Sequence, residues 1–369
     1  MKNKICMIIP YFGNFNNYFD LWVESAAHNS KIDFLIFTDN KKLKKLPYNI
    51  KWYNVSFKEV YEKIQKNIEF KISLPNPYKL VDYKPVYGLA FKEYVKEYEW
   101  WGFGDIDVIL GDLSPYIAEK NLKKYDKILD LGHFTLIRNN LENNYLWKKE
   151  VENAWSYKYA FKYPYCFHFD EGAGFSRIAD KYMLNIYHEL PKEMTFADID
   201  PSFNGFRLAY CSELESSYIF SWKAGKLFGY KCDGNKIVAK EFTYIHLQKR
   251  NMNINEHEVK KMLDDGFYIF PNKFALLTSF EINSELIDKC SKYENIQHRD
   301  VFLKKIKKII SFKYLYNRFF YNLYIKNFMK KNKIPMLANE EYFEYLKYRY
   351  NNSDNKRRKN EKNRDSDIL

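Results

Sequence analysis

Two aspartates spaced one residue apart, Asp105 and Asp107, follow an apolar and aromatic run that begins at Trp100. The run predicts a buried strand over residues 100–107, with both carboxylates near its end at the edge of a sheet. Carboxylate oxygens are the ligands that Mg²⁺ and Mn²⁺ prefer, and Mg²⁺ is usually shared between one or two carboxylates and phosphate groups. The pair therefore indicates chemistry on a metal-bound diphosphate. The alternative is an ordinary turn, because Asp caps helices and accepts turn hydrogen bonds.

A third candidate metal ligand is His246, inside the apolar segment 242–247. A histidine in such a strand is more often a satisfied core residue than a ligand. Here residues 248–250 read Gln-Lys-Arg, and a histidine that completes a carboxylate site beside a phosphate-binding lysine is a coherent arrangement. A second Asp-x-Asp, Asp198 and Asp200, lacks a preceding apolar strand and ranks below the first as a metal site.

An acidic pair, Asp170 and Glu171, precedes a Gly-Ala-Gly segment and a predicted helix. Two interpretations stay open for this pair. It could cap the helix and interact favourably with the helix dipole. It could also supply the general base that deprotonates an acceptor hydroxyl.

Two lysines and an acid, Lys79, Asp82 and Lys84, stand just before Pro85, where a helix is predicted to begin. Helix N-termini favour anions, and lysine supplies a point charge for phosphate. This segment is therefore either a diphosphate contact or a solvated loop.

The N-terminal segment brings an aromatic and an acid to one edge of the predicted sheet. A strand over residues 4–10 ends at Pro10 and Tyr11, and a strand over residues 32–38 ends at Asp39. Open α/β sheets bind ligands at the carboxyl ends of their strands, so these side chains suit a nucleobase and a ribose. The alternative is an ordinary strand-to-helix turn.

Strands and helices alternate along the first part of the chain, which predicts β-α-β units, a parallel sheet and the α/β class. The early elements are strands over 4–10, 32–38 and 50–55 and helices over 18–27 and 57–65. Later elements are a helix that opens at Pro85, a helix capped by Ser114, a strand over 134–137, a helix over 176–190, a hairpin over 218–231 that turns at Ala224 and Gly225, and a last core strand over 242–247.

Charge divides the chain unevenly. The formal net charge is +13, but residues 301–369 hold 18 Lys+Arg and 7 Asp+Glu, which leaves residues 1–300 nearly neutral at +2. A basic appendage on a neutral body points to contact with an anionic surface, either membrane or nucleic acid. A dedicated nucleic-acid-binding protein spreads its basic charge over the folded face, so the neutral body argues against that class.

The basic region 301–331 has aromatic and aliphatic stripes at helical spacing, with lysines between them. This pattern predicts an interfacial helix that binds an anionic membrane surface. The alternative is a helix that packs on the body and leaves only its lysines in water. Residues 351–369 are polar and charged and predict a disordered tail.

Five scattered cysteines, with no Cys-x-x-Cys among them, predict reduced thiols in the cytosol rather than disulfides or a structural zinc site. The apolar run at the start is too short for a signal peptide, and no stretch reaches the ~18 apolar residues of a membrane-spanning helix. We therefore expect a cytoplasmic protein, peripheral on the inner face of the plasma membrane.

Taken in order, these segments resemble the GT-A-fold glycosyltransferases, and more narrowly a bacterial group found in capsule and lipopolysaccharide synthesis clusters. The resemblance covers roughly residues 1–250 and is strongest at Asp105–Asp107 and at the late Tyr-Ile-His-Leu-Gln-Lys-Arg. Its remaining parts are Pro10-Tyr11-Phe12, Thr38-Asp39, the Lys79, Asp82, Lys84 and Pro85 segment, the Trp101-Gly102 before the aspartates, Gly111-Asp112 after them, and Gly132 with Arg138-Asn139.

The resemblance implies a GT-A-like, Rossmann-type mixed sheet flanked by helices, with a C-terminal basic helical extension. It implies that Asp107 and His246 bind Mn²⁺ or Mg²⁺, with Asp105 on the ribose or the metal. It further implies that Lys249 meets the diphosphate, that Pro10, Tyr11 and Asp39 meet the nucleoside, that Lys79, Asp82, Lys84 and Arg138 line the donor pocket, and that Asp170 or Glu171 is the catalytic base or orients the acceptor.

The implied function is transfer of a sugar from a nucleotide-sugar, UDP-linked by expectation, to a hydroxyl of a lipid-linked surface polysaccharide. A sugar nucleotidyltransferase is the main alternative, although such enzymes carry a Gly-rich phosphate loop after the first strand and only Gly13 is present here. The expected organisation is a catalytic domain over residues 1–300, with a nucleotide-sugar half (1–140) and an acceptor half (141–300), a basic amphipathic region over 301–350, and the polar tail.

Overall fold

The computed structural model describes residues 3–290, except 184, 202, 211–216 and 249, together with 323, 327, 330, 331 and 341–348. Apart from those few positions, the predicted amphipathic helix over 301–331 lies outside the described residues, as does the predicted disordered tail over 351–369.

The central element is a seven-stranded mixed sheet in the order β3-β2-β1-β4-β7-β6-β8. Six of its strands run in one direction, and β7 runs antiparallel to its neighbours β4 and β6. The strands are β1 Ile5–Pro10, β2 Ile32–Thr38, β3 Ile50–Asn54, β4 Trp100–Gly104, β6 Lys127–Leu131, β7 Phe134–Arg138 and β8 Ile186–Tyr187. The predicted α/β class, with a mixed sheet flanked by helices, is confirmed.

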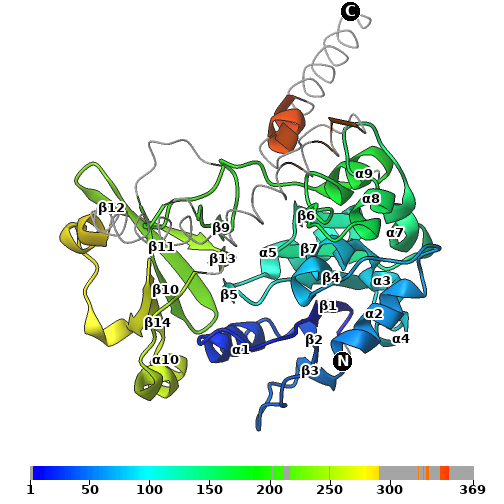
Figure 1. Cartoon of the computed structure of the whole chain (residues 1–369). Coiled ribbons are helices and arrows are strands. Elements are labelled where there is room, and N and C mark those ends of the chain that lie inside the picture. The colour runs from blue at the N-terminus through cyan, green and yellow to red at the C-terminus, as the bar shows by residue number, and fades with distance from the viewer. Residues whose placement is uncertain are drawn as a thin grey trace, which may run out of the picture.

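Both faces of this sheet are buried, which explains the continuous apolar runs in its strands. Along β1, Cys6 and Ile8 enter one core and Met7 and Ile9 enter the other. The flanking helices, visible around the sheet in Figure 1, are α1 Phe19–Ala27, α2 Phe57–Gln65, α3 Tyr87–Ala90, α4 Lys92–Val95, α5 Ser114–Ile117, α6 Glu119–Lys124, α7 Leu141–Tyr145, α8 Tyr157–Lys162 and α9 Phe175–Tyr182.

Two smaller sheets complete the body. A three-stranded sheet, β5-β13-β9, lies between the central sheet and a five-stranded antiparallel sheet, β12-β11-β10-β14-β15 (Figure 1). Their strands are β5 Val108–Leu110, β9 Ala197–Asp198, β10 Ile219–Lys223, β11 Lys226–Asp233, β12 Lys236–Phe242, β13 Tyr244–His246, β14 Phe267–Phe270 and β15 Lys273–Leu276, with α10 Val259–Asp265 between β13 and β14.

The early predicted strands and helices are confirmed within one or two residues, and so is the later hairpin. Its turn residues Ala224 and Gly225 have φ values of 47° and 80°, and β10 and β11 pair on either side of them. Two positive φ values are what a tight hairpin turn requires.

Four later expectations are wrong in their bounds. The helix expected to open at Pro85 instead follows a 3-10 helix, η1 Pro77–Val86, because the Asn76 side chain caps that earlier start. Ser114 lies inside α5, whose N-cap is Leu113. The helix expected over 176–190 ends at Tyr182 and the chain turns into β8, which pairs with β6. The strand expected over 242–247 is split into the end of β12 and β13, and β14 and β15 follow it.

The helical residues 341–348 pack on the folded body. Tyr342, Phe343 and Leu346 are buried in the same core as α1 and one face of β1. The Tyr345 hydroxyl donates to an Asp180 carboxylate oxygen at 3.0 Å. This part of the basic region therefore belongs to the folded body. Among the described residues, no helix combines the length and the apolar character needed to cross a membrane.

A buried charge cluster lies beneath this C-terminal helix. The side chain of His188 is buried, and its Nδ1 lies 2.6 Å from an Asp130 carboxylate oxygen. Lys127 Nζ and the Tyr342 hydroxyl also donate to Asp130, at 2.8 Å and 3.3 Å. Burial lowers the pKa of His188, but Asp130 raises it more, and the net pKa lies above its ordinary value. Burial raises the pKa of Asp130, but His188 and Lys127 hold it well below its usual range.

We expect His188→Gln to lower the free energy of unfolding by about 3–5 kcal/mol, because it leaves part of a buried charge cluster unpaired. A raised histidine pKa contributes stability that is fully present below the unfolded value of about 6.5 and is lost as the pH rises through the folded value. The difference from wild type, measured by urea unfolding, should therefore be largest near about pH 5–6 and shrink at higher pH. The matched control is His257→Gln at an exposed site. Equal pH profiles for the two variants would contradict the raised pKa of His188.

Candidate active site

A cavity of about 1070 Å³ opens at the carboxyl ends of β1 and β4. The sheet order reverses at this point: the chain runs from β1 out to β2 and β3, then returns to β4 on the other side of β1. In open α/β sheets this switch point is where ligands bind. Of the residues predicted as a site, those that line the cavity are Pro10, Tyr11, Lys84, Asp105, Asp107, Asp170, Glu171 and His246.

Strand pairing brings His246 to the two aspartates. β13 runs antiparallel to β5, which places His246 opposite Val108, the residue after Asp107. The Leu247 N–H also donates to the Asp107 carbonyl at 2.8 Å. His246 Nε2 consequently lies 3.5 Å from an Asp107 carboxylate oxygen.

One ligand atom from each of Asp105, Asp107 and His246 falls within 4.8 Å of the others. Two carboxylates and one imidazole form a donor set for a divalent cation, and the imidazole favours Mn²⁺ over Mg²⁺. The aspartates are partly exposed to the cavity, which leaves open positions for ligand oxygens. The residues present therefore fit a divalent cation.

Two further buried residues, Asp198 and His133, extend this cluster. His246 Nδ1 donates to an Asp198 carboxylate oxygen at 2.8 Å, and the second carboxylate oxygen lies 3.8 Å from His133 Nε2. The sequence ranked Asp198 lower because no long apolar strand precedes it. In the structure, the two-residue strand β9 pairs with β13 and thereby places Asp198 beside His246. His133 was missed, since it lies in the tight connection between β6 and β7 and carries no motif.

Lys84 links Asp105 to Asp170 of the acidic pair. Its Nζ lies 2.9 Å from an Asp105 oxygen and 3.3 Å from an Asp170 oxygen, and it donates to the Gly132 carbonyl at 3.0 Å. Burial lowers the pKa of Lys84, but Asp105 and Asp170 raise it above its ordinary value, so the lysine is charged. It neutralises part of the negative charge that the acidic side chains bring to the cavity.

Asp170 and Glu171 occupy the wall beside Lys84. The Oδ1 atom of Asp170 is buried and accepts no hydrogen bond from the described residues. Burial raises the pKa of Asp170 well above its ordinary value, although Lys84 opposes the rise. The Gly132 N–H donates to Glu171 at 3.0 Å, and a Cβ on Gly132 would lie 2.3 Å from Asp170 Oδ2. A glycine is therefore required for the acidic pair to lie this close to the chain.

Tyr11 also lines the cavity. Its ring stacks on Phe15 with centroids 5.0 Å apart, and its hydroxyl donates to the Asn14 carbonyl at 3.0 Å. Burial, and then the nearby charge of Asp107, raise its pKa. A partly exposed aromatic ring beside a carboxylate pair suits a flat, polar ligand such as a nucleobase.

Several residues with a strained backbone also line this cavity. His168, Tyr210 and Gln248 have φ values of 50°, 63° and 53°, and all three line the cavity. Non-glycine residues in the left-handed region cost about 1–3 kcal/mol each and cluster at functional sites.

Lys79 and Asp82 do not line the cavity, contrary to expectation. Both side chains are fully buried and form an ion pair with each other. Lys79 also donates to the Ala160 carbonyl at 2.6 Å, and Asp82 accepts from the N–H groups of Phe167 and Phe169 at 2.9–3.1 Å. The physical reason is that the η1 helix turns this pair inward. The pair anchors the loop that carries Asp170 and Glu171, so its role is structural.

Two other predicted residues, Arg138 and Asp39, lie away from the lining. Arg138 is wrongly placed by the prediction: it pairs with Asp126 at 3.0 Å and its guanidinium lies over Trp100. It is the last residue of the antiparallel strand β7, opposite the first residue of β4, and so lies at the edge of the sheet away from the cavity. Asp39 is exposed at the carboxyl end of β2, outside the cavity lining. Lys249 lies outside the described residues.

Comparison with protein families gives one match. Residues 7–278, well over half of the chain, match the model described as "Family of unknown function (DUF6625)". The chain belongs to the DUF6625 family. No curated protein matches this DUF6625 chain.

Two solved structures resemble the DUF6625 chain in part. One is the galactosyltransferase LgtC in complex with donor and acceptor sugar analogs, at 11% identity and a TM-score of 0.31, covering 53% of this chain and 76% of LgtC. The other is an active-site mutant of LgtC, at 10% identity and a TM-score of 0.33, covering 65% of this chain and 86% of the mutant. These scores are too low to assign an activity, so the function of the DUF6625 chain is argued from its own geometry.

We expect Asp82→Asn to loosen the loop over residues 165–171, because it removes the charge that balances Lys79 and weakens the acceptor for two N–H groups. Breaking one partner of a buried pair costs about 3–5 kcal/mol. Hydrogen exchange followed by mass spectrometry should show faster exchange in this loop and little change in β1 and β2. Asp264→Asn, at an exposed site on α10, is the matched control. Unchanged exchange in Asp82→Asn would show that the pair does not anchor the loop.

Proposed function

We propose that this protein is a metal-dependent glycosyltransferase that moves a sugar from a nucleotide-sugar, UDP-linked by preference, to a hydroxyl of a glycan acceptor. The observation that carries the proposal is the convergence at one cavity of Asp105, Asp107 and His246 with a buried lysine and an acidic pair. The sequence resemblance to GT-A glycosyltransferases supports the same conclusion from the order of the segments.

The donor side of the site comprises the strand ends. Tyr11 offers a partly exposed ring for the base, and Asp105, fixed by Lys84 at 2.9 Å, is oriented to accept hydrogen bonds from ribose hydroxyls. Asp107 and His246 would hold the divalent cation. A cation bound there acts as a Lewis acid on the departing nucleoside diphosphate. The chain itself positions the diphosphate and excludes part of the water around it.

The acceptor side is the wall that carries Asp170 and Glu171. Both residues line the cavity, where a carboxylate can accept a hydrogen bond from a sugar hydroxyl, and such a bond is worth more in a buried setting than it would be in water. In an inverting reaction one of these two acids takes the proton of the attacking hydroxyl. In a retaining reaction the pair would instead orient the acceptor.

The acceptor class we propose is a lipid-linked oligosaccharide of capsule or lipopolysaccharide synthesis, at the inner face of the plasma membrane. The basic composition of residues 301–331 supports this placement, since each lysine near an anionic leaflet contributes about 1 kcal/mol of binding. We also propose that residues 1–140 form the nucleotide-sugar half and residues 141–300 the acceptor half. The cavity lining draws on both.

A thermal-shift screen of UDP-, GDP- and CMP-sugars, each with and without Mn²⁺, tests the proposal. The expected result is a Mn²⁺-dependent rise in melting temperature for one nucleotide class, because a ligand that binds only the folded state stabilises it. The absence of any shift with every nucleotide-sugar would contradict the proposal. Release of a nucleoside triphosphate when pyrophosphate is added to the bound sugar nucleotide would instead identify a nucleotidyltransferase.

We expect Asp107→Ala to lower Mn²⁺-dependent release of nucleoside diphosphate by at least about 100-fold, since it removes a direct ligand and even outer partners of metal sites are worth 10–100-fold. The measurement is a coupled assay for the released diphosphate, with circular dichroism to confirm the fold. Asp264→Asn is again the control and should retain wild-type activity. Full activity in Asp107→Ala would show that the cation site is placed wrongly.

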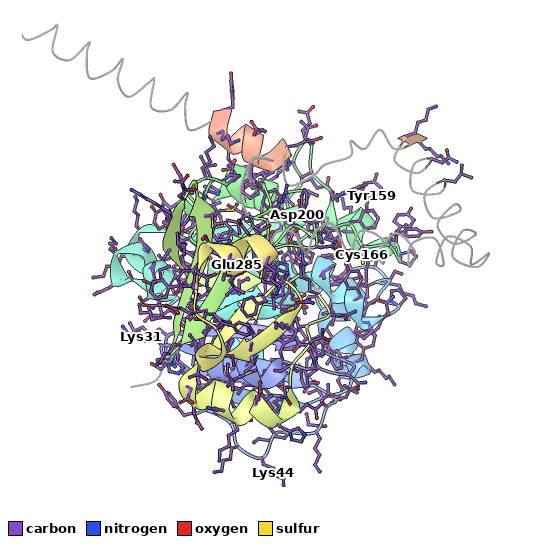
Figure 2. All side chains as sticks on the ribbon, turned by 90° about the vertical axis from the view of Figure 1, so that its left-hand side faces the viewer. Lys31, Lys44, Tyr159, Cys166, Asp200 and Glu285 are labelled. Carbon is purple, nitrogen blue, oxygen red and sulfur yellow. The ribbon has the colours of Figure 1, made fainter. Side chains whose placement is uncertain are left out.

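The membrane proposal has a matched test within the chain. Residues 304–308 read Lys-Lys-Ile-Lys-Lys and residues 41–45 read Lys-Lys-Leu-Lys-Lys. Replacing the four lysines of 304–308 with Gln should weaken binding to phosphatidylglycerol vesicles by at least about tenfold in a sedimentation assay at low salt. The same replacement in 41–45, where Lys44 projects from the body (Figure 2), should have little effect. Equal losses, or none, would contradict a membrane role for the basic region.

A further inference from the structure

The buried carboxylate Asp198 lies directly behind His246. β9 and β13 pair in parallel, with Asp198 in register with His246, and Asp198 Oδ1 accepts from His246 Nδ1 at 2.8 Å. The opposite ring nitrogen, Nε2, faces Asp107 at 3.5 Å. Asp198 is 3% exposed and His246 is 9% exposed, so neither side chain can exchange this contact for water.

The position of Asp198 is itself fixed from several directions. Gln248 Nε2 donates to the same Oδ1 atom at 2.9 Å, and His133 Nε2 lies 3.8 Å from Oδ2. The Ala209 N–H donates to the Asp198 carbonyl at 2.7 Å, which holds the backbone. Gln248 reaches Asp198 from a strained backbone, with φ at 53°.

An imidazole carries one proton when neutral, and the hydrogen bond that one nitrogen makes decides which nitrogen holds it. A carboxylate accepts and cannot donate. A hydrogen bond to Asp198 therefore keeps the proton on Nδ1 and leaves the Nε2 lone pair directed at the side of Asp107. Metal-binding histidines are generally oriented by such a carboxylate partner.

We propose that Asp198 is a positioning residue that sets the tautomer and ring orientation of His246 for cation binding. The inference rests on the proposed function, in which His246 is a metal ligand. Asp198 itself does not touch the cation.

The same atoms offer a competing arrangement in which a cation lies among His133, Asp198 and His246, whose ligand atoms also fall within 4.8 Å of one another. His246 Nδ1 and Asp198 Oδ1 are 2.8 Å apart, however, which is a direct hydrogen-bond distance. All three residues are at least nine-tenths buried, so a cation among them would be less accessible to a diphosphate than one held by the partly exposed Asp105 and Asp107. The geometry favours a hydrogen-bonded partner over a second ligand.

The test compares Asp198→Ala with Asp198→Asn. Alanine removes the acceptor, so Mn²⁺ affinity, measured by electron paramagnetic resonance of free Mn²⁺, should fall about 10–100-fold. Asparagine keeps a carbonyl oxygen for His246 and can turn its NH₂ toward His133, so it should recover most of the affinity. Asp200→Asn, two residues along the chain and outside the cavity lining (Asp200 is labelled in Figure 2), is the control and should bind Mn²⁺ as wild type does.

A second measurement reads the tautomer without metal. Long-range ¹H–¹⁵N spectra of ¹⁵N-histidine-labelled protein, recorded at a pH at which the His246 ring is neutral, should show His246 protonated at Nδ1 in wild type and in Asp198→Asn, with the pattern lost in Asp198→Ala. His246→Gln assigns the signal.

The outcomes distinguish failure of the Asp198 positioning role from failure of the proposed glycosyltransferase function. If wild type binds Mn²⁺ and Asp198→Ala binds it equally well, the positioning role is wrong and the glycosyltransferase proposal stands. If wild type binds no Mn²⁺, the proposed function fails, and the tautomer spectra still decide whether Asp198 orients His246. Loss of binding in His133→Ala together with unchanged binding in Asp107→Ala would place the cation in the buried cluster and overturn the positioning role.

Discussion

The placement of β13 between β5 and β9 is the constraint on which the candidate site depends. This three-residue strand brings His246 from late in the chain against Asp107 on one side and Asp198 on the other. Each backbone pairing fixes one of these contacts, so the cluster is held by the fold and not by flexible side chains. A shift of β13 by one residue would turn His246 to the opposite face of the sheet and dissolve the cluster.

Buried ion pairs hold the loops around the cavity in place. Lys79 and Asp82 lie under the loop that bears Asp170 and Glu171, while Lys84 joins Asp105 to Asp170 across the cavity. Buried pairs add little net stability compared with apolar packing, but breaking one is costly. Their contribution here is to hold loops at the strand ends in a single arrangement. The cluster at Asp130 performs a similar task for the helix over residues 341–348.

The sequence predicted the elements whose signal is local. Apolar runs such as Ile32–Thr38 gave the strands, and helical spacing with a cap gave Phe57–Gln65. The Asp-x-Asp pair and His246 were found because each follows or interrupts an apolar run. Asp198 was ranked below the first pair and His133 was missed, since their importance comes from pairing between β9 and β13 and from a tight turn, neither of which has a local signature. Lys79 and Asp82 were wrongly predicted to line the cavity. A charged segment in the sequence does not reveal which of its side chains turn inward.

The central claim is that Asp105, Asp107 and His246 together bind a divalent cation. Anomalous diffraction tests this claim most directly. A crystal grown with Mn²⁺ and UDP, measured at the manganese absorption edge, should show one strong anomalous peak among the carboxylates of Asp105 and Asp107 and Nε2 of His246. A peak between His133 and Asp198, or a cavity without any peak, would contradict the account.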